Sequence, residues 1–148
     1  MRDLIRHLGC CRRGASAVEF GMIAPVMVLL FAGMVDLAGA MQQTIRLESA
    51  ARAGAQYAMG FPGDTSGIVA ATAAALGAGD GTVAVVPAYC ACPGGGSTAV
   101  SCEGTPCDGS PSAVYVEVSV TRPYAAIIGL GGYVLPSTLS GTAVTRVR

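Results

Sequence analysis

The chain has 148 residues, of which 52% are hydrophobic and 12% charged, and its nine basic and nine acidic residues balance to zero formal charge. Soluble domains usually carry about 25% charged residues, so this composition argues against an ordinary cytosolic enzyme and indicates a membrane-embedded segment. The zero net charge indicates no nucleic-acid partner, and the single histidine, His7, excludes a histidine-dependent catalytic or metal site in the body of the chain.

A basic leader precedes an apolar run at the start of the chain. Residues 1–14 contain four arginines and one acid, whereas residues 20–35 contain no charge. As a helix, residues 15–41 are long enough to cross a hydrocarbon core of about 30 Å. Because the arginines lie before this span, the positive-inside rule predicts a single-pass protein with residues 1–14 in the cytoplasm and residues 42–148 outside.

The helical pattern continues beyond the span and becomes amphipathic. Its apolar face is expected to comprise Ile45, Leu47, Ala51, Ala55 and Ala58. Gly60, followed by Phe61 and Pro62, predicts the end of the helix. These signals together predict one helix from Ala15 to Met59, about 65 Å long.

Shorter elements are predicted after this helix. Asp64 is expected to cap a second helix over residues 65–76, which Gly77 ends. Strands are predicted over residues 82–86, 113–121 and 137–147, and a loop rich in Gly, Pro and Cys over residues 87–111. The clearest strand signal is alternation with polar residues of Val114, Val116, Val118 and Val120. The predicted fold class is α+β, with a long N-terminal transmembrane helix, a second helix and an antiparallel sheet of about three strands.

The most informative stretch lies where the leader meets the span. It reads Arg12-Arg13-Gly14, then four small or apolar residues, then Glu19 and Phe20. This arrangement resembles the class III prepilin cleavage site, where a membrane aspartyl peptidase cuts after the glycine. The resemblance implies that prepilin peptidase cuts after Gly14 and that Ala15 is the mature N-terminus. Glu19 and Phe20, the motif residues that follow the cut, are our candidates for pairing between subunits.

The resemblance extends through a longer ordered set of residues: Ala17-Val18-Glu19-Phe20, Pro25, Asp36-Leu37 and the AARAGAQYA sequence of residues 50–58. Residues 14–59 are similar to TadE-like proteins of the tight-adherence (Flp) pilus system. Gly39 departs from the pattern, because a larger and often basic residue is expected there, and the resemblance does not explain the cysteine-rich loop.

This resemblance implies a non-enzymatic pseudopilin or minor-pilin-like subunit in the bacterial inner membrane, with a pilin-like domain in the periplasm or at the cell surface. It implies a role in building an adhesive pilus, and hence in cell adhesion and biofilm formation. The implied partners are prepilin peptidase, other pilin or pseudopilin subunits, the pilus assembly platform and the lipid bilayer.

The cost of placing a charge in lipid suggests a role for Glu19 at the start of the span. A carboxylate in hydrocarbon costs about 2.5–3.5 kcal/mol on insertion scales. Cleavage after Gly14 creates an α-amino cation at Ala15, which a neighbouring subunit displaced along the helix axis can place beside Glu19. The alternative is that Glu19 extends into the lipid headgroups.

Other residues of the span are candidates for helix packing. Ala17 and Gly21 form a small-xxx-small pair that allows close approach of a second helix. Pro25 removes one hydrogen bond of the helix and leaves the carbonyl of Gly21 free. Asp36 lies about 25 Å beyond Glu19 along a helix, so it is expected at the opposite membrane boundary or in a polar contact with a neighbouring helix.

The six cysteines fall into two groups. Cys10 and Cys11 lie in the leader and are expected to be reduced, whereas the outer group is expected to form disulfides: Cys90, Cys92, Cys102 and Cys107. A bond between Cys90 and Cys92 would be strained, which leaves two cross-pairings with Cys102 and Cys107 open. A zinc site of four thiolates is the alternative, but its usual ligand spacing does not fit, and no metal or other cofactor is predicted.

A different class of function is compatible with the N-terminal pattern. Ordinary signal peptidase cutting after Ala40, at the Ala38-Gly39-Ala40 sequence, would release a secreted periplasmic binding domain. A membrane-bound enzyme has weaker support, because the sequence lacks nucleophile-elbow, phosphate-loop and zinc-protease motifs.

Overall fold

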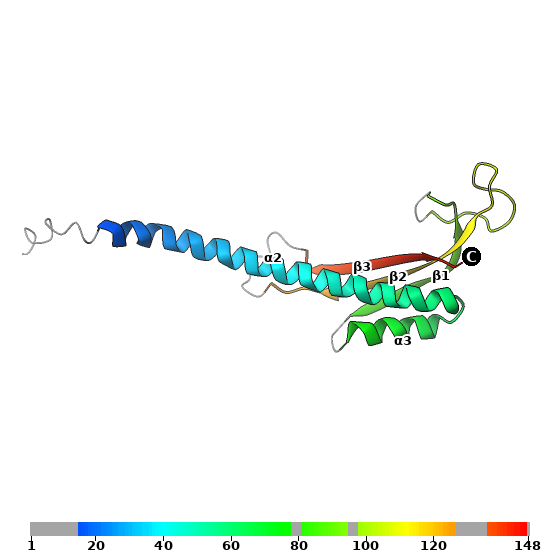
Figure 1. Cartoon of the computed structure of the whole chain (residues 1–148), viewed down its shortest axis with the longest axis horizontal. Coiled ribbons are helices and arrows are strands. Elements are labelled where there is room, and N and C mark those ends of the chain that lie inside the picture. The colour runs from blue at the N-terminus through cyan, green and yellow to red at the C-terminus, as the bar shows by residue number, and fades with distance from the viewer. Residues whose placement is uncertain (1–14, 78–80, 95–97, 127–135, 148) are drawn as a thin grey trace, which may run out of the picture.

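The computed structural model describes residues 15–77, 81–94, 98–126 and 136–147. Its elements in chain order are α2 (Ala15–Gly60), α3 (Thr65–Leu76), β1 (Thr82–Ala91), β2 (Ala113–Pro123) and β3 (Thr138–Arg146). The strands form one antiparallel sheet in the order β1-β2-β3. The first half of α2 projects beyond this sheet, whereas its second half lies along the sheet with α3 beside it (Figure 1). The predicted α+β fold is confirmed.

The first strand is longer than the sequence predicted. The expectation of a loop from Pro87 was wrong for residues 87–91, which belong to β1. The pairing of β1 with β2 shifts register between Val86 and Tyr89, and Pro87 falls in this irregularity. Because β1 is an edge strand, a proline is tolerated there, since it has no N–H to donate to a neighbour.

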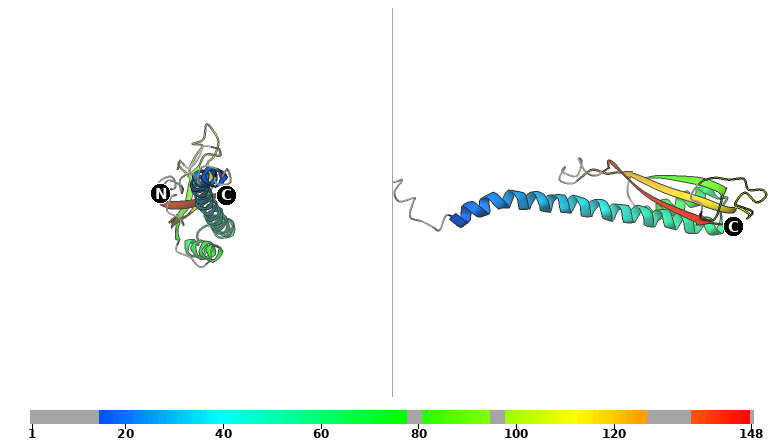
Figure 2. Two further views of the ribbon diagram at one scale, coloured as in Figure 1. Left: turned by 90° about the vertical axis from the view of Figure 1, so that its left-hand side faces the viewer. Right: turned by 90° about the horizontal axis from the view of Figure 1, so that it is seen from above.

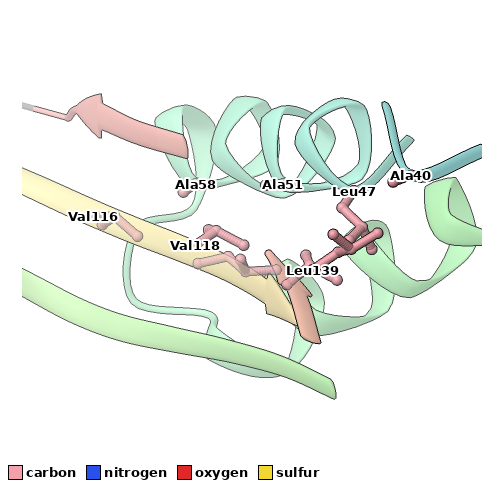
Figure 3. Packing of buried hydrophobic residues seen from close by; sticks show 9 residues of the cluster. Ala40, Leu47, Ala51, Ala58, Val116, Val118 and Leu139 are labelled. Atoms are coloured by element: carbon pink, nitrogen blue, oxygen red, sulfur yellow. The ribbon is translucent and has the colours of Figure 1, made fainter. Parts of the chain in front are cut away.

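The second half of α2 forms the core together with the sheet. The residues that meet there are small or branched, and Figure 3 shows them interleaved between helix and strands: Ala40, Leu47, Ala51, Ala58, Val116, Val118 and Leu139. Val116, Val118 and Val120 are fully buried, which confirms the alternation predicted for β2. The buried side of β2 faces α2, and α3 adds Ile68 to the same core.

One residue assigned to the apolar face of α2 points elsewhere. Ile45 is 67% exposed, whereas Leu47 is 1% exposed, so the prediction that both share the buried face was wrong. Residues two apart on an α-helix point about 160° away from each other around its axis. The sheet covers the Leu47 side and leaves Ile45 on an uncovered side of α2.

Two glycines allow close contacts with α2 in this core, one with backbone and one with side chains. A Cβ on Gly141 of β3 would clash with the backbone of Leu47 and Glu48, so only glycine fits this contact between β3 and α2. A Cβ on Gly54 would clash with the hydroxyl of Thr72 in α3. Small residues at these positions let the sheet and α3 lie directly against the same turns of α2.

We expect Gly141→Ala to destabilise the protein by about 1–3 kcal/mol, because the added methyl group meets helix backbone that cannot rotate away. Thermal unfolding of the full chain in detergent, followed by circular dichroism, measures the change in Tm. Gly63→Ala is the matched control, because a Cβ there meets nothing within 4 Å. Equal Tm values for the two variants would contradict the close approach of β3 to α2.

Candidate functional site in the long helix

The large apolar side chains in the first half of α2 are left uncovered by the described part of the chain. The large apolar side chains of residues 20–35 are between 45% and 72% exposed. In the described part of the chain, α2 is the one helix that is long and apolar enough to cross a membrane, which fits a single-pass membrane protein. Exposed apolar surface of this extent marks contact with lipid or with other chains.

The residues of the cleavage-like motif lie at the exposed start of α2. Ala15 is the first residue of the helix, and Gly14 lies outside the described residues. Glu19, one helical turn further, is exposed and has no hydrogen bond or ion pair with the described residues. Phe20 beside it is 72% exposed. Pairing of Glu19 and Phe20 with another subunit stays a prediction, for which both side chains are accessible.

Three of the four residues predicted to pack against another helix lie within the exposed segment. Ala17, Gly21 and Pro25 are all exposed, and a Cβ on Gly21 would meet nothing within 4 Å. α2 continues without interruption through Pro25 and is gently curved along its length (Figure 2). The Ala17 and Gly21 positions therefore offer a shallow surface that the described part of the chain does not fill, and their role in helix packing stays a prediction.

Asp36 lies where Tyr124 of the outer domain contacts α2. It is 1% exposed, and the Tyr124 hydroxyl donates a hydrogen bond of 2.8 Å to its backbone carbonyl. Tyr124 follows β2, and its own N–H donates to the carbonyl of Ser137 at 2.8 Å. Asp36 is thus buried within its own chain. Its contact with a neighbouring helix stays a prediction.

A polar network joins the end of α2 to the start of α3. Asp64 caps α3 as predicted, because its Oδ1 accepts hydrogen bonds from the Gly67 N–H at 2.9 Å and the Ser66 hydroxyl at 2.7 Å. The Tyr57 hydroxyl donates to Asp64 Oδ2 at 2.9 Å. The hydrogen bonds from Ser66, Gly67 and Tyr57 lower the pKa of Asp64, and the bond to Asp64 in turn raises the pKa of Tyr57. Tyr57 of the AARAGAQYA sequence thus links the end of α2 to the cap of α3. The spacing of the sequence did not predict this role.

Four outer cysteines form two disulfides that close the loop after β1. Cys90 bonds to Cys102 and Cys92 to Cys107, with Cα–Cα distances of 5.2 and 5.4 Å. This is one of the two cross-pairings that the sequence left open. With all four thiols paired, the loop has no thiolate to offer a metal, and the described residues contain no cluster of His, Cys, Asp or Glu that could hold one.

Comparison with known proteins supports the interpretation of the N-terminal third. Residues 14–56 match the family described as TadE-like protein. The match confirms the resemblance stated from the sequence and supports a role related to pilus assembly, in which a structural rather than an enzymatic protein is expected. No curated protein and no solved structure matches the chain.

We expect the cap of α3 to depend on pH through Asp64. Because the pKa of Asp64 is lowered from its ordinary value of 3.8 in the folded protein, its carboxylate stabilises the fold above that pH, and the stabilisation is lost as the pH falls through the lowered pKa. Asp64→Asn keeps a capping oxygen but removes this titration. The Tm difference between wild type and Asp64→Asn should therefore be largest near neutral pH and narrow below pH 3.8.

Thermal melts of the full chain between neutral and acidic pH measure this difference. Glu103→Gln serves as the control, because Glu103 is an exposed acid in the disulfide-closed loop and contacts neither helix end. A difference between wild type and Asp64→Asn that stays constant over the whole range would contradict the role of the Asp64 carboxylate.

Proposed function

We propose, from the TadE-like match over residues 14–56, that this chain is a pseudopilin or minor-pilin-like subunit that helps assemble a tight-adherence (Flp) pilus and so supports surface adhesion. Its function depends on packing of α2 in a membrane or filament, without catalysis. The observation that carries the proposal is the exposed, charge-free half of α2, which follows directly after the Arg-Arg-Gly leader and Glu19.

Processing changes the charge of the chain in a way that suits this function. Removal of residues 1–14 takes away four arginines and one acid, which leaves five basic and eight acidic residues and a side-chain balance of −3. The basic leader therefore acts only in the precursor, where it holds residues 1–14 in the cytoplasm. In this arrangement prepilin peptidase cuts after Gly14, and residues 42–148 lie in the periplasm.

The outer domain fits an oxidising compartment. The Cys90–Cys102 and Cys92–Cys107 disulfides lie in its loop, and disulfides persist in the periplasm and at cell surfaces rather than in the cytosol. Their location supports the inner-membrane orientation that the leader arginines predict. Other pilin or pseudopilin subunits and the assembly platform are the proposed partners of α2.

Release of a secreted domain by signal peptidase has less support from the structure. A cut after Ala40 would divide α2 within a continuous helix and remove Ala40, which is 4% exposed and belongs to the core. It would also detach Asp36 from Tyr124. Release after Ala40 would therefore remove contacts that the folded outer domain makes with residues before the cut.

The proposed processing predicts the N-terminus of the protein in cells. Edman sequencing or mass spectrometry of the protein from membrane and sheared-surface fractions should give Ala15 as its first residue. A protein that begins at Met41 would support the secreted domain instead. A protein that retains residues 1–14 would contradict the proposal and indicate a plain membrane anchor.

We expect Glu19→Gln to be processed and inserted normally but to lose assembly, because a neutral amide cannot pair with the α-amino cation at Ala15 of a neighbour. The amount of this chain in the sheared-surface pilus fraction should fall about tenfold or more at equal protein level. Glu48→Gln is the matched control, since Glu48 lies on the same helix and pairs with Arg52 on the surface at 3.1 Å. Normal assembly of Glu19→Gln would show that the glutamate does not pair subunits.

A further inference from the structure

The two disulfides of the outer domain are interleaved in the sequence. Cys92 lies between Cys90 and its partner Cys102, and Cys102 in turn lies between Cys92 and its partner Cys107. Neither bond therefore joins two cysteines that are neighbours in the chain. Four cysteines can pair in three ways. The two other sets are a consecutive one, Cys90–Cys92 with Cys102–Cys107, and a nested one, Cys90–Cys107 with Cys92–Cys102.

Chain entropy does not select the native set. The native bonds span 12 and 15 residues, whereas the nested bonds would span 10 and 17. Because the cost of closing a loop grows only with the logarithm of its length, these two sets are about equally favourable. On the same scale, the span of five residues from Cys102 to Cys107 is favoured about fivefold over the native span of 15 residues from Cys92 to Cys107. Mispairing therefore competes with native pairing in the unfolded chain.

The cysteine-rich loop has few contacts of its own that would select one pairing. Residues 101–106 are all exposed, so they bury no apolar surface. The contacts that position the first cysteine come from its strand: Cys90 lies opposite Val114 of β2, and its carbonyl accepts a hydrogen bond of 2.7 Å from the Val100 N–H. Alignment of the native cysteines thus depends on the pairing of β1 with β2.

The strand that provides this alignment follows all four cysteines. β2 begins at Ala113, so in a domain that crosses the membrane from residue 42 onward the four thiols emerge before β2 does. This step rests on the proposed function, which places residues 42–148 in the periplasm. The periplasm is kept oxidising by a dithiol oxidase. Bonds that form at this stage are determined by proximity along the chain and not by the fold.

A fully mispaired domain has no thiol with which to correct itself. Once two bonds have formed, residues 42–148 contain no further cysteine, and Cys10 and Cys11 lie in the leader, which the proposed orientation places across the membrane. Disulfides rearrange through attack by a thiolate. The attacking thiolate must therefore come from another molecule.

We propose that the outer domain is a substrate of a periplasmic protein disulfide isomerase, whose cysteine thiolate rearranges the bonds that a dithiol oxidase has formed. Oxidation of the four thiols to two disulfides releases four electrons and four protons, which two disulfides of the oxidase accept as they become dithiols. The later rearrangement transfers no net electrons, and the isomerase leaves it unchanged.

The rearrangement of the consecutive set balances in three exchanges. The isomerase thiolate attacks Cys102, which breaks the Cys102–Cys107 bond and leaves Cys107 as a thiolate. Cys107 attacks Cys92, which breaks the Cys90–Cys92 bond and leaves Cys90 as a thiolate. Cys90 then attacks Cys102 in the mixed disulfide and releases the isomerase thiolate. The products are the two native bonds.

Folding ends the exchange at the native set. Cys90 is 4% exposed in the folded domain, so an external thiolate has little access to it once β1 and β2 have paired. Residues 98–112 lie at the end of the domain away from the exposed half of α2 (Figure 1). The loop is therefore within reach of a periplasmic protein while the chain stays in the membrane.

Disulfide mapping in cells with and without the isomerase tests the proposal. The full chain is purified from a producing bacterium and from the same strain without its periplasmic disulfide isomerase, with free thiols alkylated at lysis. Mass spectrometry of unreduced peptides, with fragmentation between Cys90 and Cys92, identifies the bonds. The native fraction should fall about threefold without the isomerase, because three sets without selection leave about one third native. An unchanged native fraction would overturn the proposal.

A variant with a single outer disulfide is the matched control. The double substitution Cys92→Ser and Cys107→Ser leaves only Cys90 and Cys102 in the outer domain, so no wrong pair can form there. The yield of its bond should be the same in both strains. A yield that falls without the isomerase would show that the enzyme acts on bond formation and not on pairing, and would overturn the proposal.

Reoxidation of the purified full chain tests the same step without cells. The chain is reduced in guanidinium and diluted into detergent with copper phenanthroline, an oxidant that supplies no thiol. This treatment should give a mixture of the three sets, and a catalytic amount of reduced isomerase should convert the mixture to the native set. Native bonds formed with the oxidant alone, or a mixture that the isomerase leaves unchanged, would overturn the proposal.

The N-terminus and the thiol content of the cellular samples separate this proposal from the proposed function. A protein that begins at Ala15 and has native bonds without the isomerase retains the proposed function and refutes the need for exchange. A protein that keeps residues 1–14 but requires the isomerase contradicts processing and supports exchange. Four free thiols in both strains would contradict the periplasmic location and overturn both proposals.

Discussion

The structure depends on one continuous helix whose two halves have different surroundings. α2 runs from Ala15 to Gly60 without a break, and its first half is exposed and apolar whereas its second half is buried against its own sheet and α3. The change occurs around Asp36, where Tyr124 binds the helix backbone. Because a helix rises a fixed 1.5 Å per residue, this contact sets the height of the outer domain above the apolar segment.

The second half of α2 holds the domain closely because its contact residues are small. Gly141 lets β3 approach the backbone of the helix, Gly54 makes room for the Thr72 side chain of α3, and Ala51 and Ala58 keep the layer thin. Interiors packed in this way transmit displacement instead of absorbing it. The close packing therefore fixes the outer domain to the second half of α2.

Much of this architecture could be predicted from local sequence signals. The start of α2, both ends of α3, the Asp64 cap and the alternation in β2 depend on residues close together in the chain, and all were confirmed, whereas α2 ends at Gly60, one residue later than predicted. The extension of β1 was missed because pairing with β2 outweighs the local preference of Pro87. The exposed position of Ile45 was missed because an amphipathic pattern gives a broad face but not the side that a distant sheet will cover.

The contacts that position the candidate site were the least predictable. Tyr124 lies 88 residues from Asp36 in sequence, and no local sequence pattern predicts the hydrogen bond between them. Tyr57 and Asp64 lie on either side of a turn, so helical spacing does not bring them together. Such links depend on the whole fold, whereas the cleavage-like motif at Gly14 and Glu19 is a contiguous pattern that can be recognised without any structure.

The two acids of the apolar segment differ in their surroundings, and in the proposed assembly this difference sets the order of events. Asp36 is buried by its own chain at the outer end of the segment. Glu19 at the other end is exposed and has no ion pair within the described residues. A carboxylate near hydrocarbon that its own chain leaves unpaired is stabilised most by a cation from outside the chain. In the proposed assembly that cation is the α-amino group at Ala15 of a neighbour. Because this group exists only after cleavage, subunits associate after processing, when the outer domain is already folded.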